Sequence, residues 1–120
     1  MSDRASCKAA FIVEAHGLLD AIEDVVESKG DVEKMRVKLD IAKHNRMLLG
    51  ELATQFRARV RPHLASAGGD TPLVVGQELL SSICGEGAPR LREPIVAPSV
   101  VARVLACARG MDAKVDVLCA

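Results

Sequence analysis

Residues 31–64 read DVEKMRVKLDIAKHNRMLLGELATQFRARVRPHL and decide the fold. Proline is absent before position 62 in this stretch, and apolar side chains recur at steps of three and four residues. This spacing is typical of an amphipathic helix that packs one face against other helices. The sequence therefore predicts one long helix, whose packed face consists of Val32, Met35, Leu39, Ala42, Leu49, Ala53, Phe56 and Val60.

A second apolar face lies opposite the first when positions advance by about 100° per residue. It consists of Val37, Ile41, Leu48 and Leu52. Two interpretations stay open. The helix crosses the middle of a four-helix bundle or covers a later segment, or it keeps this face for oligomerisation, for a docked protein partner or for a membrane.

Three further helices are expected around the long one. The first covers about residues 5–28, and Lys29-Gly30-Asp31 forms the turn that follows, because Gly30 suits a helix C-terminus and Asp31 an N-cap. The third starts at residues 70–72 and stops at Gly85, and the fourth runs from Pro98 or Ser99 to the chain end. The long helix is expected to end at Pro62 and the run of residues 66–69.

These elements predict an all-α fold, a four-helix bundle with a long second helix and antiparallel up-down packing. At 120 residues the chain forms a single domain, 1–120, and a helix still periodic at the last residues favours the N-terminal part of a longer protein. The expected core is Phe11, Ala15, Leu18, Ile22, Val25, Met35, Leu39, Leu49, Phe56, Leu80, Ile83, Val101, Val104, Met111 and Val115.

Composition argues against several classes of protein. Apolar residues make up 49% of the chain, but Trp and Tyr are absent and the aromatic residues are Phe11 and Phe56 alone. An all-β domain or an enzyme pocket usually recruits more aromatic side chains. The formal net charge is zero, which argues against a general nucleic-acid binder.

No group of residues in this sequence is a candidate for catalysis or for metal binding. The histidines are spread over different turns, and the four cysteines, Cys7, Cys84, Cys107 and Cys119, form no C-x-x-C pair. We therefore expect no enzyme activity, no cofactor, no metal site and no small-molecule substrate. Without a secretory signal or an apolar run of about 18 residues, the chain is expected to be cytoplasmic with reduced thiols.

Charge is unevenly distributed along this neutral chain. Residues 1–30 hold three basic and six acidic side chains, whereas residues 31–64 hold eight basic and four acidic ones. The long helix is therefore the cationic element. It either pairs with the acidic first helix inside the fold or attracts an anionic lipid or an acidic partner.

Three of these cations, Arg57, Arg59 and Arg61, gather at the end of the long helix. They complement the helix dipole there, and the same charges suit an anionic surface. The sequence does not separate these two roles.

The order of elements resembles the N-terminal four-helix bundles of cell-death executors, namely the mixed-lineage kinase domain-like pseudokinase, fungal HeLo domains and related plant bundles. Residues 37–43, VKLDIAK, look like the start of the long second helix in HeLo domains, where a similar LDIAK run occurs. The chain departs from that family in two ways: its extreme N-terminus is nearly neutral, and its first helix is not markedly hydrophobic and glycine-rich.

The resemblance implies a non-catalytic signalling bundle that oligomerises and engages the plasma membrane in regulated cell death or immunity. The residues expected to contact the membrane or a partner are Lys34, Arg36, Lys38, Lys43, Arg57, Arg59 and Arg61. The alternative is a soluble helical adaptor that docks a protein partner through the second apolar face.

Overall fold

Helices form where apolar side chains recur at helical spacing, and each ends at a residue that stops the pattern. The computed structural model describes residues 3–65, 71–85, 87–91 and 98–119. Along these ranges the helices are α1 (Arg4–Ile22), α2 (Lys29–Lys43), α3 (Arg46–Arg59), α4 (Arg61–Leu64), α5 (Thr71–Cys84) and α6 (Pro98–Cys119). The all-α prediction is confirmed for the described residues, whereas a bundle of four antiparallel helices is not.

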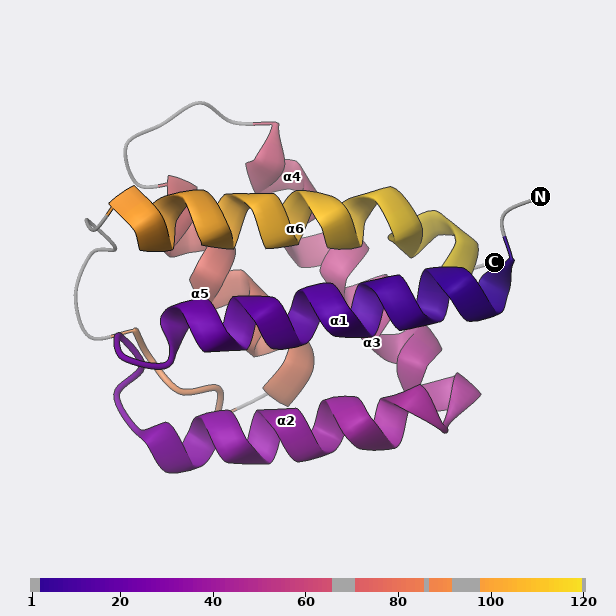
Figure 1. Ribbon diagram of the computed structural model, residues 1–120, viewed down its shortest axis with the longest axis horizontal. Helices are drawn as coiled ribbons and strands as arrows, with labels where there is room; N and C mark the ends of the chain where they lie inside the picture. The colour runs from indigo at the N-terminus through magenta and orange to yellow at the C-terminus, as the bar shows by residue number, and fades with distance from the viewer. Residues whose placement is uncertain (1–2, 66–70, 86, 92–97, 120) are drawn as a thin grey trace.

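The helices lie in two layers. Figure 1 shows α2, α1 and α6 side by side, with α3 and α5 crossing behind them. The start of α1 lies beside the end of α6, since Arg4 donates hydrogen bonds to the carbonyl oxygens of Val117 and Leu118 at 3.0 and 3.4 Å. α1 and α2 run in opposite directions, because Asp20 and His16 of α1 pair with Arg36 and Asp40 of α2.

The long second helix predicted over 31–64 is wrong, because the chain breaks after Lys43 and resumes helical structure at Arg46. Asn45 has extended backbone angles (φ −130°, ψ 102°), and its side-chain oxygen accepts a hydrogen bond from the Leu48 N–H at 3.1 Å. Asparagine at an N-cap supplies a partner to an otherwise unpaired helical N–H. The two halves of the predicted helix are therefore free to take different directions, and α3 passes behind the front layer (Figure 1).

The first helix is shorter than predicted. It ends at Ile22, and residues Lys29–Asp31, predicted as a turn, belong to the first turn of α2. A long-range contact explains the early end: the Glu27 N–H donates to the Arg90 carbonyl oxygen at 3.1 Å, and Val26 forms a β-bridge with Leu91. Glu23 keeps helical backbone angles and the Val26 N–H still donates to the Ile22 carbonyl oxygen, so the chain leaves helical geometry near Val26, where it contacts the loop that follows α5.

The later boundaries agree better with the sequence. α5 ends at Cys84, and Gly85 follows with φ +69°, a conformation that glycine adopts at little cost. α6 begins at Pro98 as predicted. Residues 66–70, predicted to end the long helix and to start the third, lie outside the described residues.

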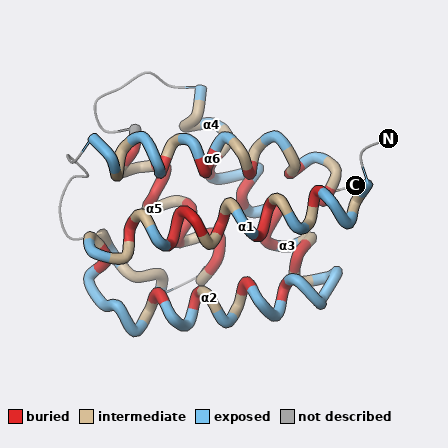
Figure 2. The backbone as a smooth tube through the Cα atoms, in the orientation of Figure 1, coloured by how far each residue is buried: buried red, intermediate tan, exposed pale blue. Residues whose placement is uncertain are grey.

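The core lies between the two layers, and Figure 2 shows buried and exposed segments alternating along the front helices. Every residue of the predicted core is buried except Val25 and Val101, which are half-buried against it. The two phenylalanines meet in the core, with ring centroids 6.0 Å apart in an edge-to-face arrangement. Phe11 belongs to α1 and Phe56 to α3, so this contact joins the front layer to the back.

Candidate functional site

The arginines at the end of α3 and in α4 pair with carboxylates of other helices. Arg61 Nε lies 2.7 Å from Asp112 Oδ1, and its Nη2 lies 3.0 Å from Asp116 Oδ2. Arg57 Nη1 lies 3.4 Å from Asp116 Oδ1. These contacts tie α3 and α4 to α6. A guanidinium that binds two carboxylates through several N–H groups is held in a defined position.

Arg59 is paired more loosely than Arg61. Its Nη1 lies 3.8 Å from Glu78 Oε2 of α5, and its Nε donates to Gln55 Oε1 at 3.0 Å. The sequence left open whether these three arginines face a lipid surface or serve the fold, and the observed pairs are those expected of a role within the fold. Their carboxylate partners lie on α5 and α6, not on the acidic first helix. Lipid contact by these arginines stays a prediction.

These contacts change the pKa of the Asp116 carboxyl group. Hydrogen bonding from Arg61 holds the pKa of Asp116 below its usual value, with a smaller contribution from Arg57. The unfolded chain, with an Asp pKa of about 3.9, therefore binds more protons than the folded protein near that pH. The stability contributed by Asp116 is fully present above about pH 4 and is lost as the pH falls through the folded pKa.

We expect Asp116→Asn to flatten the loss of stability in acid. Urea unfolding midpoints measured from about pH 6 down to about pH 2.5 should fall less steeply in the variant than in the wild type. Glu51→Gln is a suitable control, because Glu51 is an exposed carboxylate on α3 with no ion pair among the described residues. Identical pH profiles for Asp116→Asn and the wild type would contradict the proposed linkage.

The cations predicted on the first half of the long helix divide into two groups. Arg36 is held between Asp20 of α1 and Glu33, with its Nε 3.7 Å from Glu33 Oε1. This is the pairing with the acidic first helix that the sequence allowed. Lys34, Lys38 and Lys43 form no ion pair among the described residues. The three lysines therefore leave positive charge available at the surface of α2.

The second apolar face is divided by the break at Asn45. Val37 and Ile41 on α2 are 56% and 52% exposed, whereas Leu52 on α3 is 5% exposed and Leu48 is half-buried. Leu48 and Leu52 instead line a surface groove of about 490 Å³, together with residues of α5 and Lys38. The structure thus does not bring the four residues onto one face, and Val37 and Ile41 alone form an outward apolar pair.

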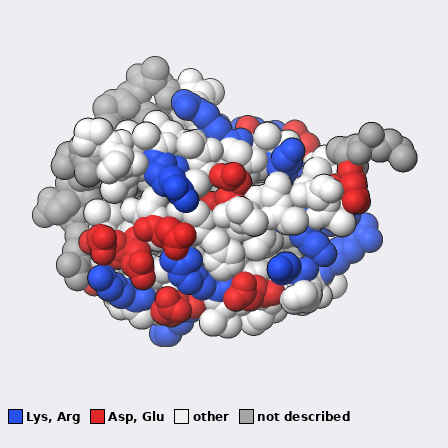
Figure 3. All heavy atoms as spheres, viewed as in Figure 1, with Lys and Arg blue, Asp and Glu red and all other residues white. Residues whose placement is uncertain are grey.

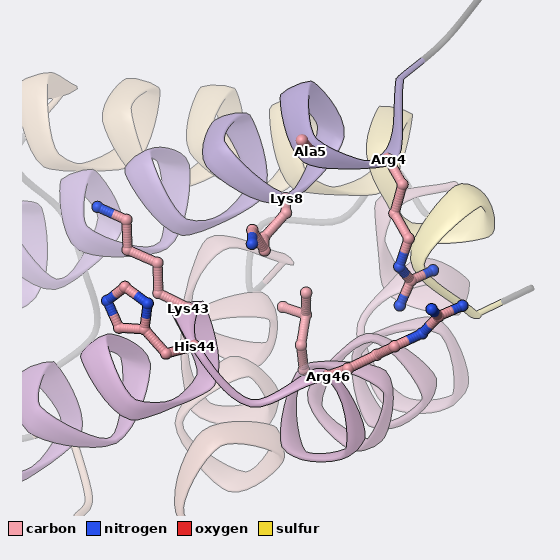
Figure 4. Close-up of a pocket in the computed structure, with 7 residues that line it drawn as sticks. Arg4, Ala5, Lys8, Lys43, His44 and Arg46 are labelled. Atoms are coloured by element: carbon pink, nitrogen blue, oxygen red, sulfur yellow. The ribbon is translucent and has the colours of Figure 1, made fainter.

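A basic pocket lies where α1 begins, α2 ends and α3 begins, and the sequence did not single it out. Its volume is about 450 Å³, and Figure 4 shows side chains of both α1 and the α2–α3 connection reaching around it. The pocket exists because the chain turns at Asn45. Asn45 is the residue in the sequence that could have indicated this turn, because it precedes a helical repeat and suits an N-cap. The lining residues are Arg4, Ala5, Lys8, Lys43, His44, Arg46 and Leu49.

Metal-binding and redox groups are sparse in the described part of the chain. It contains no group of three or more histidine, cysteine or acidic side chains placed to hold a metal ion. The cysteines are free thiols, and burial raises the pKa of both Cys84 and Cys107. None of the described helices is long and apolar enough to cross a bilayer.

Comparisons of the chain with protein-family models, with curated proteins and with solved structures find no match.

Proposed function

We propose that this protein is a non-catalytic helical module that docks an amphipathic helix of a protein partner along the outer face of α2. The observation that carries the proposal is the exposed pair Val37 and Ile41, one helical turn apart. Aliphatic residues at this spacing pack against i, i+3 and i+4 side chains of a second helix.

The position of α2 makes this face accessible. Its buried residues, Val32, Met35, Leu39 and Ala42, face α1 and the back layer, and Val37 lies on the opposite side of the helix. α2 forms one edge of the front layer (Figure 1). A partner helix can therefore lie along α2 without displacing any described element.

The charges beside this pair indicate the chemistry of the partner. Lys34 and Lys38 precede Val37 and Ile41 by three residues each, so they lie on the same side of α2, and neither has an ion pair among the described residues. A partner helix with carboxylates beside its apolar stripe matches this arrangement. Charges at the rim of an interface set the register and speed association more than they add affinity.

A photo-crosslinking amino acid at position 37, introduced into the chain expressed in its native cells, tests the proposal. The chain that carries this amino acid at position 37, and is otherwise wild type, should crosslink to a partner segment whose apolar residues recur at helical spacing beside acidic ones. The double variant Val37→Asp and Ile41→Asp should lose the same partner from affinity purification, whereas Val13→Asp should keep it. Val13 is a matched control because it is 67% exposed and lies on the neighbouring helix α1.

Three outcomes are informative. Equal recovery of partners by the double variant and by Val13→Asp would overturn the proposal. A concentration-dependent dimer that the double variant abolishes, measured by light scattering, would replace the partner helix with a second copy of the chain. Crosslinks from position 37 that map to an acidic amphipathic helix of one partner would support the proposal.

Engagement of anionic membranes by an oligomer is the second candidate, and its role in cell death or immunity rests on the family resemblance alone. Unpaired Lys34, Lys38 and Lys43 favour it, because cations near an anionic leaflet contribute on the order of 1 kcal/mol each. Co-sedimentation of the same variants with anionic vesicles separates the two candidates. Binding that weakens with salt and survives Val37→Asp and Ile41→Asp would favour the membrane.

A further inference from the structure

The basic pocket is built from parts of the chain that are distant in sequence. Arg4 and Lys8 reach it from α1, Lys43 from the end of α2, and Arg46 from the start of α3. In Figure 4 the side chains of Arg4 and Lys8 extend from α1, that of Arg46 extends toward Arg4, and that of Lys43 extends the opposite way, beside His44. The fold thus gathers four permanent cations and His44 around a single hollow.

No acidic side chain lines this pocket. Among the described residues, Lys8, Lys43 and Arg46 have no ion pair, and Arg4 donates to two backbone carbonyl oxygens of α6, which leaves its charge without a carboxylate. Figure 3 shows basic side chains gathered at the end of the molecule where α1 begins and α2 ends. Arg61, which follows the other end of α3, differs from these cations because it binds two carboxylates.

The start of α3 adds to the positive potential of the pocket. Arg46 is the first residue of α3, where the helix dipole already places partial positive charge. At the start of α1, by contrast, the carboxylate of the N-cap Asp3 accepts a hydrogen bond from the Ala5 N–H and offsets the dipole. α3 has an uncharged N-cap, Asn45, and no acidic residue in its first turn. An arginine at this position is unfavourable in the free protein, and an anion bound beside it removes that penalty.

We propose that the basic pocket binds a phosphate monoester. A terminal phosphate carries close to two negative charges and three acceptor oxygens, so one compact group can receive hydrogen bonds from several of these cations at once. The pocket volume of about 450 Å³ exceeds what phosphate alone requires, so it also admits part of the organic group that bears the phosphate. Ala5 and Leu49 supply apolar lining for that part.

A phosphate monoester can belong to a soluble metabolite or to a lipid headgroup, and one probe represents each source. Glycerol 3-phosphate is titrated into isotopically labelled protein, and chemical shifts of backbone amides are followed. In parallel, the protein is co-sedimented with phosphatidylcholine vesicles with and without phosphatidic acid, which presents the same phosphate monoester at a membrane surface.

The pocket variant is Lys43→Gln with Arg46→Gln, and the control is Arg109→Gln with Lys114→Gln on α6. Both pairs remove two positive charges, and none of the four side chains forms an ion pair within the described part of the chain. We expect shift changes centred on residues 4–8 and 43–49. The dissociation constant should rise about tenfold or more in the pocket variant and less than about twofold in the control.

Binding of either probe with this variant pattern supports the proposal and identifies its source. Absence of binding to both probes overturns it. Equal weakening in the pocket variant and the control also overturns it, because the attraction would then come from net charge and not from the pocket. Retained thermal stability of the pocket variant shows that any loss of binding is local, since Lys43 and Arg46 are exposed.

Discussion

Replacing Phe56 by Ala should destabilise the protein by about 3–5 kcal/mol. Phe56 is fully buried and meets Phe11 edge to face across the two helix layers. The substitution removes the ring, leaves a cavity that the crossing helices fill only in part, and loses an aromatic contact worth about 0.5–1.5 kcal/mol. Domains of this size are stable by about 5–15 kcal/mol in total, so about a fifth of the stability or more is at risk.

Urea unfolding followed by circular dichroism measures this effect, with the slope of the transition showing whether unfolding stays two-state. Met47→Ala is the matched control, because Met47 lies on the same helix and is 77% exposed. Its effect should stay within about 0.5 kcal/mol. A loss below about 1 kcal/mol for Phe56→Ala would contradict the packing of α3 between the layers.

The core could be predicted from the sequence because burial follows helical spacing along each segment separately. Leu39, Leu49 and Phe56 are buried whether or not one continuous helix carries them. The break at Asn45 does not alter this, since Ala42 and Leu49 are seven residues apart and each lies on the inner face of its own helix. Local periodicity thus identifies which side chains are inside without giving the direction of the helices.

The break itself had a sequence signal that periodicity concealed. A continuous amphipathic helix would place an apolar residue at position 45 or 46, and the chain has Asn45 and Arg46 there. No apolar side chain therefore holds these residues against the core, and asparagine satisfies a free N–H better as a cap than inside a helix. The interruption of the repeat and the cap together predict the end of one helix and the start of another.

Other features depend on contacts that no local pattern contains. The early end of α1 follows from hydrogen bonding between residue 27 and residue 90, and the arginine pairs follow from α6 lying beside α4. The basic pocket likewise needs α1 to lie across the α2–α3 connection. Sequence indicated that residues 31–64 are cationic, but only the fold decides which charges are paired and which remain available.

Gly17 lies where α1 packs against side chains of α6. A Cβ atom at Gly17 would lie 3.3 Å from Cys107 Sγ and 3.4 Å from Arg103 Nη2. Gly50, by comparison, lies within α3 and has no heavy atom within 4 Å of the same added atom. The two glycines therefore share a helical backbone and differ in the space beside them.

Gly17→Leu should destabilise the protein by roughly 2–3 kcal/mol, whereas Gly50→Leu should stabilise it by up to about 1 kcal/mol. Leucine gains close to 1 kcal/mol in helix propensity over glycine at both sites, so propensity cancels in the comparison. What remains is the cost of fitting four extra heavy atoms between α1 and α6, because the Cys107 side chain beside Gly17 is buried in a closely packed core. Thermal unfolding of the two variants measures the difference directly. Equal stabilities would mean that the α1–α6 contact is loose, and Arg4 would then lack the fixed partner helix that holds it at the basic pocket.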